Sequence, residues 1–203
     1  MTPICGGYTF AESPEVEAPD ARIIWHASFD PGTLQVIAEP HRAGDPDALD
    51  PILLAPWLTV VADRGGEHAV LSDGWHHLRL DVVDGSLAGG PVLLHYQLHG
   101  IATVQRKVLP LRRLVDLYRH RRFSAELYPR DRRIDRWTQT LRVHDALAAG
   151  ASQRDIGRVL FGGDLAAGTR DAESLRARVR RLVADARLLG RGAYRTLLSG
   201  HWR

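Results

Sequence analysis

Residues 149–156 read AGASQRDI, and these eight positions combine a helix stop, a short corner and a helix start. Gly150 suits the left-handed backbone that often ends a helix. Ser152 can accept a hydrogen bond from the Asp155 N–H while the Asp155 carboxylate reaches back to the Ser152 N–H, the arrangement of a capping box. The apolar residues that follow predict the buried stripe of a short second helix: Ile156, Val159 and Leu160. The stretch predicts a helix-turn-helix-like core, with an ordinary helical hairpin as the alternative.

The helix expected over 173–189 carries one continuous apolar face. At ~100° per residue its apolar positions fall within an arc of ~120°. They are Leu175, Val179, Leu182, Val183, Ala186 and Leu189. Most of the remaining surface is arginine, at Arg176, Arg178, Arg180, Arg181 and Arg187. Asp185 is the one acid after the first turn, so internal i, i+4 ion pairs cannot neutralise the helix. A solvated surface helix is the alternative, but this imbalance favours phosphate contact with some side chains reaching base edges.

A long connection separates the second and third of these helices. A helix-turn-helix corner takes about 3 to 4 residues, whereas residues 162–172 lie between the two helices here. Either the recognition helix follows a longer loop, or a different pair of helices matters. The loop contains Gly163, Gly168, Thr169 and Arg170. These residues suit either a loop that approaches a phosphate backbone or an ordinary surface loop.

The whole second half of the chain has a helical pattern. From residue 101 onward apolar residues recur at i, i+3, i+4 and i+7. Pro110 divides 101–109 from 111–121, which predicts either two helices or one kinked helix. Further helices are expected over 135–149, 152–161 and 173–189, each followed by glycine, with a final turn over 194–198.

The first half reads as strands and turns. Short apolar runs alternate with Asp, Gly and Pro connectors that favour hairpin turns. They predict strands over 22–26, 34–39, 58–63, 67–71, 76–83 and 92–99, with one helical turn after Asp50 and Pro51. Leu78 and Leu80 share one side of their strand, while Arg79 and Asp81 share the other. We therefore expect an antiparallel sheet with one covered face.

These patterns predict an α+β chain, with an N-terminal antiparallel β-rich region followed by a C-terminal helical domain that has a helix-turn-helix-like core. The expected divisions are an acidic leader over 1–21, a β-rich domain over 22–100 and a helical, DNA-binding domain over 101–203.

Charge separates the two halves. Residues 1–100 hold 4 Lys+Arg against 14 Asp+Glu, and residues 101–203 hold 23 against 10, so net charges of −10 and +13 lie behind the overall +3. A half this basic attracts a polyanion, of which nucleic acid is the commonest, and the acidic half is repelled by it. We expect the acidic half to mediate self-association, to meet a partner, or to dock on the basic half when DNA is absent.

A membrane or secreted protein is not expected. The longest uncharged apolar stretch, 51–62, is interrupted by Pro56 and is shorter than the ~18 to 20 residues of a membrane span. The amino terminus lacks a basic-then-apolar signal, and Cys5 alone cannot form an internal disulfide. A bacterial cytoplasm is therefore the expected compartment.

Neither a metal site nor an enzyme centre is expected. His95 and His99 lie ~13 Å apart along a strand, too far to share one ion. His144 lies beside the Trp137 and Leu141 stripe of its helix, where we expect it to pack and not to bind metal. The chain has no Gly-x-Ser-x-Gly elbow, no Walker loop and no Gly-x-Gly-x-x-Gly after a strand. We expect no cofactor, no metal and no catalysis.

Segments spread over the second half resemble one known family. They are LYP (127–129), RR (132–133), RW (136–137), LAAGASQRDI (147–156), LFG (160–162), SLR (174–176), RRL (180–182) and GAYR (192–195). Over roughly residues 91–198 they resemble the RovC-like DNA-binding domain, found in a regulator of type VI secretion genes and in relatives that regulate integrative and conjugative elements. His144 replaces an apolar residue of the family pattern, and the family's tryptophan after Gly163 is absent.

The resemblance implies a transcription regulator that binds double-stranded promoter DNA and forms a homo-oligomer. From their positions, we expect phosphate contacts from Gln153, Arg154 and Arg158 on the second helix and Arg170 in the loop. The candidates for reaching a groove lie on the third helix: Ser174, Arg176, Ala177, Arg178, Arg180 and Arg181. The alternative is an anti-activator or assembly module that binds another regulatory protein through the same helices.

Overall fold

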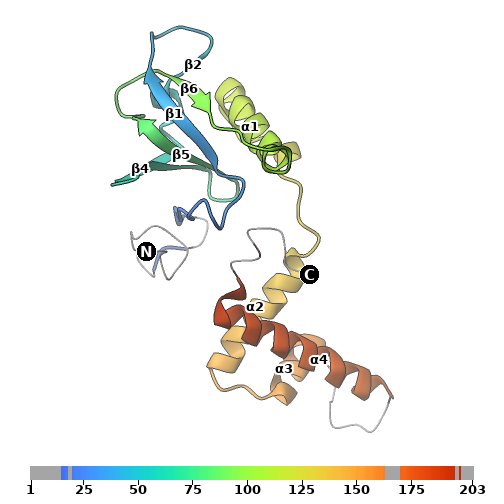
Figure 1. Ribbon diagram of the computed structural model, residues 1–203. Coiled ribbons are helices and arrows are strands. Elements are labelled where there is room, and N and C mark those ends of the chain that lie inside the picture. The colour runs from blue at the N-terminus through green and yellow to red at the C-terminus, as the bar shows by residue number, and fades with distance from the viewer. Residues whose placement is uncertain (1–14, 18–19, 163–169, 195–196, 198–203) are drawn as a thin grey trace. The chain divides into compact units, whose positions relative to one another are not determined.

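The computed structural model describes residues 15–17, 20–162, 170–194 and 197 (Figure 1). The chain divides into two compact units, Met1–Pro129 and Arg130–Arg203, and each is described by itself. A sheet in the first unit and helices in the second confirm the predicted α+β class. None of the helices within the described ranges has the length and apolarity that a membrane crossing requires.

The first unit is built on a six-stranded sheet with the order β2-β6-β1-β5-β4-β3. The strands are β1 Leu34–Pro40, β2 Ala48–Leu49, β3 Leu58–Asp63, β4 Gly66–Ser72, β5 His77–Gly85 and β6 Val92–Tyr96. Asp50 caps the predicted helical turn, η1 Pro51–Leu54, by accepting from the Ile52 N–H at 3.0 Å. Residues 22–26, expected as a strand, contain only an isolated bridge at Trp25. The Trp25 carbonyl is instead an acceptor for the Arg79 guanidinium.

The sheet is mixed, not purely antiparallel as predicted. β1 pairs with β5 in parallel, with Leu34 opposite Leu80, while the other strand pairs are antiparallel. The chain forms β2, η1, β3 and β4 between these two strands, and a connection of that length permits a parallel neighbour. Gly85, at φ +82°, lets the end of β5 approach β1, because a Cβ there would collide with the Ala38 carbonyl oxygen.

One face of the sheet packs against α1 (Ile101–His120), which Figure 1 shows lying along it. Leu114 and Leu117 of the helix join the apolar residues of β1 and β5 in one core. α1 runs through Pro110 without a break. The sequence allowed either two helices or one kinked helix here, and the structure has one helix. The proline ring is buried, and the helix continues although proline cannot donate a hydrogen bond to the carbonyl four residues earlier.

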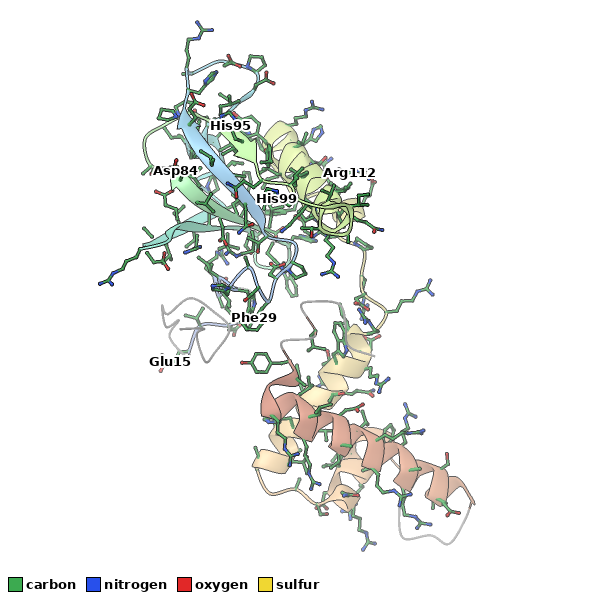
Figure 2. The ribbon with its side chains drawn as sticks, viewed as in Figure 1. Glu15, Phe29, Asp84, His95, His99 and Arg112 are labelled. Atoms are coloured by element: carbon green, nitrogen blue, oxygen red, sulfur yellow. The ribbon has the colours of Figure 1, made fainter. Side chains whose placement is uncertain are left out.

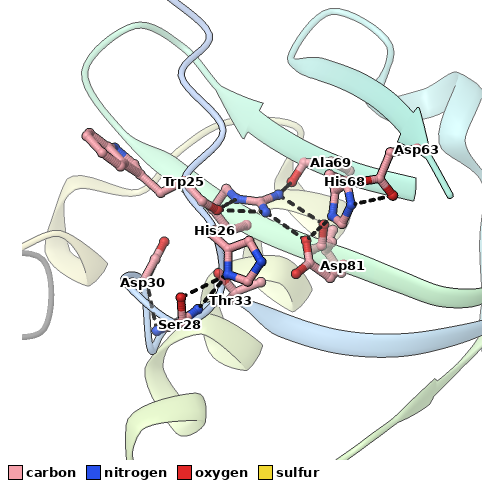
Figure 3. A network of polar contacts seen from close by, with 12 residues as sticks. Trp25, His26, Ser28, Asp30, Thr33, Asp63, His68, Ala69 and Asp81 are labelled. Atoms are coloured by element: carbon pink, nitrogen blue, oxygen red, sulfur yellow. Dashed lines mark hydrogen bonds and ion pairs between the residues drawn. The ribbon is translucent and has the colours of Figure 1, made fainter. Parts of the chain in front are cut away.

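The other face of β5 is covered as well, which corrects the prediction of one covered face. Arg79 and Asp81 are both buried. The Arg79 guanidinium donates to Asp81 Oδ1 at 2.7 Å, to the Trp25 carbonyl at 3.1 Å and to the Ala69 carbonyl (Figure 3). His68 Nδ1 lies 2.9 Å from the same Asp81 oxygen. Alternation alone predicts solvent for such residues, but opposite charges two residues apart on one strand face can pair inside the protein.

The second unit is a helical bundle. Its elements are α2 Ile134–Ala148, α3 Gln153–Phe161, α4 Arg170–Leu188 and the π-helical turn η3 Leu189–Ala193. Their apolar stripes form one core of Val143, Ile156, Val179, Leu182, Val183 and Ala186. The prediction that Val159 is buried is wrong, since its side chain is 82% exposed. The buried side of α3 is centred between Ile156 and Gly157, and Val159 lies more than ~100° away from that direction. The turn expected over 194–198 lies largely outside the described residues.

Candidate functional site

The corner between α2 and α3 contains the predicted capping box. The Asp155 N–H donates to Ser152 Oγ at 3.3 Å, and the Ser152 N–H donates to Asp155 Oδ2 at 3.1 Å. Gly150 has φ +84°, a conformation that favours glycine, and its N–H donates to the Leu147 carbonyl at 3.0 Å. Hydrogen bonds from the Ser152 side chain and backbone lower the pKa of Asp155. The corner therefore fixes the start of α3 relative to the end of α2.

Gly190 in η3, the turn that follows α4, leaves room for a histidine of α2. A Cβ at Gly190 would lie 2.7 Å from His144 Nε2, so the imidazole occupies space that any other residue at 190 would need. His144 is half-buried and packs against this position, as expected for a packing residue. No group of three His, Cys, Asp or Glu side chains in the described part of the chain is arranged to hold a metal ion.

The arginines of α4 form two rows, one on each side of its buried stripe. At ~100° per residue the first row is Arg178 and Arg181, and the second row is Arg176, Arg180 and Arg187. The side chains of both rows are exposed except that of Arg176, which is half-buried. Between the rows, opposite the core, lies a ridge of two small residues, the half-buried Ala177 and the exposed Ala184. Ser174 is exposed near the start of the helix.

The protein neutralises few of these arginines itself. Asp185, the acid that α4 carries beyond its first turn, pairs with Arg136 of α2 at 2.8 Å. The Arg178 guanidinium lies over the Phe161 ring, with Cζ 4.3 Å from the ring centroid. Among the residues that the structure describes, no carboxylate forms an ion pair with Arg178, Arg180 or Arg181. Within the described residues, Arg178, Arg180 and Arg181 therefore present positive charge that no carboxylate neutralises.

A hollow lies beside the first row, between α2 and α4. Its lining residues are Asp135, Arg136, Gln139, Arg178, Arg181, Leu182 and Asp185. Arg136 and Gln139 were not predicted as site residues. Their i, i+3 spacing on the expected helix indicates a shared polar face, but nothing in the sequence says which helix lies opposite.

The other predicted residues lie on or beside α3. Gln153, Arg154 and Arg158 are all exposed on this helix. The positive charges of Arg158 and Arg154 add to the lowering of the Asp155 pKa that its hydrogen bonds begin. Arg170 is the first residue of α4, and its side chain lies outside the described structure, as does the loop 163–169.

The basic character of the chain is concentrated in its second unit. Residues 130–203 hold 16 arginines against 8 Asp+Glu, a net charge of +8. Residues 1–129 hold 11 Lys+Arg against 16 Asp+Glu, a net charge of −5. A polyanion would therefore be attracted to the helical bundle and repelled by the rest of the chain.

Comparison with known proteins gives one match. The model of a family described as "T6SS, Transcription factor, DNA binding domain" (RovC_DNA-bd) matches residues 100–199. Neither curated proteins nor solved structures match this chain. The matched range begins at α1, which packs in the first unit, and extends through all the helices of the second.

Proposed function

From the match of residues 100–199 to the RovC DNA-binding domain family, a transcription factor domain, we propose that the chain is a sequence-specific, double-stranded DNA-binding transcription regulator. We propose 101–203 as the region responsible for DNA binding. A regulator of promoters works beside the chromosome, so we place it in the bacterial cytoplasm, and we propose that it acts as a homo-oligomer.

The shape and charge of α4 support this proposal most directly. The major groove of B-DNA is about 12 Å wide and admits one α-helix. A helix in the groove turns its outer ridge to the base edges and its two flanks to the phosphates of the two strands. On α4 the ridge is small, at Ala177 and Ala184, and both flanks carry arginine. Arg180 and Arg181 border the ridge most closely and are the side chains best placed to reach bases.

The α3 candidates supply a second set of contacts in this proposal. Gln153, Arg154 and Arg158 are exposed on a helix that the capping box holds at a fixed corner. Side chains of this kind commonly contact phosphates and set the orientation of the protein on the duplex without reading sequence. Arg170, at the start of α4, is proposed to add a phosphate contact, and Ser174 a groove contact.

A gel mobility shift with charge-matched variants tests the proposal. The test variant changes Arg176, Arg180 and Arg181 to Ala, and the control variant changes Arg22, Arg42 and Arg64 of the first unit to Ala. We expect the test variant to lose retardation of genomic DNA fragments and the control to retain it, with both keeping the circular dichroism of the unmodified chain. Sequencing of immunoprecipitated genomic fragments should return a sharp consensus. Equal loss in the two variants would contradict a specific role for α4.

A second candidate function rests on an apolar hollow between α2 and α3. Its lining residues are Gln139, Arg142, Val143, Ala146, Ala151, Asp155, Ile156, Val159 and Leu160. The 82% exposure of Val159 favours a surface that contacts another protein, as an anti-activator or assembly module would need. This candidate is supported if the chain retards no DNA at low salt and if Val159→Asp abolishes capture of a regulatory protein.

A further inference from the structure

α1 carries a second apolar stripe on the side away from the sheet. The stripe that faces the sheet is Lys107, Pro110, Leu114 and Leu117. On the outer side Ile101, Val108 and Val115 are 92%, 49% and 46% exposed. These three residues recur every seven positions, the spacing with which one helix contacts another along its length. α1 is thus apolar on its outer side as well as its inner side.

A hollow adjoins the carboxyl-terminal end of this outer stripe. Its apolar lining comes from Leu111 and Val115 of α1 and from Leu127, which follows the helix in η2 (Ala125–Leu127). The charged lining residues are Arg112, Asp116, Arg119, His120, Arg122 and Glu126. Figure 2 labels Arg112 on α1. An apolar floor with a charged rim is the form of groove that receives an amphipathic helix.

The rim is cationic in effect. Arg112, Arg119 and Arg122 are exposed, and within the described residues none of them is ion-paired with a carboxylate. Asp116 is already occupied, because it accepts from Ser124 Oγ at 2.5 Å and lies 3.7 Å from His120 Nε2. Glu126 is the remaining carboxylate of the lining. The lining therefore has three arginines without a carboxylate partner and one carboxylate that could pair with them.

We propose that the outer face of α1 and this hollow together bind an acidic amphipathic helix of a partner protein. The partner's apolar residues would cover Ile101, Val108 and Val115, and its Glu or Asp side chains would pair with Arg112 and Arg119. At ~1.5 Å per residue the stripe from 101 to 115 is ~21 Å long, which a helix of four turns covers. The proposal concerns the first unit and does not depend on DNA binding by the second.

Charge and polarity argue for this occupant over two others. A second copy of α1 would bring its own net charge of +4, since residues 101–120 hold five Lys+Arg and one Asp, and like charges would repel. A phosphate backbone would satisfy the arginines but would leave the apolar stripe against a polar surface, with Glu126 near the phosphates. An acidic helix with apolar anchors satisfies both parts of the surface.

Designed peptides and the full-length chain provide the test. One fluorescent peptide of about three heptads carries Leu at a and d and Glu at the flanking positions, and a second replaces each Glu by Lys. Binding is measured by fluorescence anisotropy with the unmodified chain, Arg112→Glu/Arg119→Glu, Val108→Asp, and the charge-matched control Arg42→Glu/Arg64→Glu. All of these positions are exposed, so each variant should keep its fold, which circular dichroism checks.

We expect the Glu peptide to bind the unmodified chain and the control equally, and to bind the Arg112→Glu/Arg119→Glu variant and the Val108→Asp variant about tenfold more weakly. The Lys peptide should prefer the Arg112→Glu/Arg119→Glu variant. Equal binding of the Glu peptide to all four chains overturns the proposal. Loss of duplex DNA affinity confined to the Arg112→Glu/Arg119→Glu variant would assign the face to phosphate instead, and dissociation of a dimer by Val108→Asp would assign it to a second copy.

Discussion

Asp81 provides the charge that makes a buried arginine tolerable in the first unit. Its carboxylate accepts from Arg79 at 2.7 Å and lies 2.9 Å from His68 Nδ1. Replacing Asp81 by Ala leaves the Arg79 charge buried without its counter-ion, so we expect the free energy of unfolding to fall by about 3 kcal/mol. Urea unfolding followed by circular dichroism measures the change. Asp84→Asn, at the exposed end of the same strand, serves as the control and should change stability little.

The pKa of Tyr128 should lie well above the ordinary value of a tyrosine. Burial raises its pKa from 10.0 to about 12, against a smaller opposing effect of Arg113, whose guanidinium carbon lies 4.0 Å from the ring centroid. Because the folded state holds this proton more tightly than the unfolded state, the contribution to stability is complete below pH 10 and is lost as the pH rises toward about 12.

Ultraviolet absorbance of tyrosinate checks this pKa directly. Tyr128→Phe should remove the component that titrates near pH 12 and should flatten the decline in unfolding free energy above pH 10. The Tyr128 hydroxyl is buried and has no hydrogen-bond partner among the residues that the structure describes, so its removal should cost little stability at neutral pH. An unchanged titration in the variant would show that another tyrosine carries the raised pKa.

Single residues also show where a local pattern misleads. Alternation placed Arg79 and Asp81 outside, and they are inside because they neutralise each other. The helical spacing placed Val159 inside, and it is outside because α3 buries the side centred near Ile156 and Gly157. In both cases the deciding contact comes from a neighbouring element, which a periodic pattern does not specify.

At the scale of one helix, the capping box makes a testable contribution. Ser152→Ala removes the acceptor for the Asp155 N–H and the hydroxyl that lowers the Asp155 pKa. The first turn of α3 should therefore be less stable. We expect a loss of about 1 kcal/mol in the stability of the helical bundle. Amide hydrogen exchange measures it, with faster exchange at the first turn of α3. Ser174→Ala, on the exposed side of α4, is the matched control.

Elements with a strong local signal were predictable from the sequence, and elements defined by distant partners were not. Residue spacing, turn residues and caps that are close in sequence predict the corner at 149–152 and the strands β1 and β3 to β6. The parallel pairing of β1 with β5 joins positions 34 and 80, and no local feature encodes it. Pro110 left two outcomes open because its cost depends on what the ring packs against.

For the whole molecule, the concentration of charge in the second unit predicts how DNA binding responds to salt. If about five phosphates are neutralised by the arginines of α3 and α4, log K should fall with log salt concentration at a slope of about −4.5. Mobility shifts over a salt series give the slope. The single variant Arg158→Ala, which removes one proposed phosphate contact, should have a slope shallower by about 0.9, and a flat response in the unmodified chain would contradict binding through phosphates.

The sequence predicted how charge divides between the two halves of the chain, but it did not predict which distant elements pack against each other. The basic arginine helix was predicted from residues 173–189, and its rows and ridge follow from the same periodicity. Arg136, which pairs with Asp185, and the packing of α1 with the sheet could not be predicted, because both depend on contacts between elements far apart in the chain.

Lys107 is the one lysine of the sequence, and it is buried on the inner side of α1, where its ammonium donates to the Thr33 carbonyl. Burial also lowers its pKa. A reagent that acylates amines should therefore leave the side chains of the folded protein untouched and should modify position 107 only when α1 has come away from the sheet. Mass spectrometry after a brief acylation pulse would then give the fraction of Lys107 that is modified, which reports how often the first unit opens.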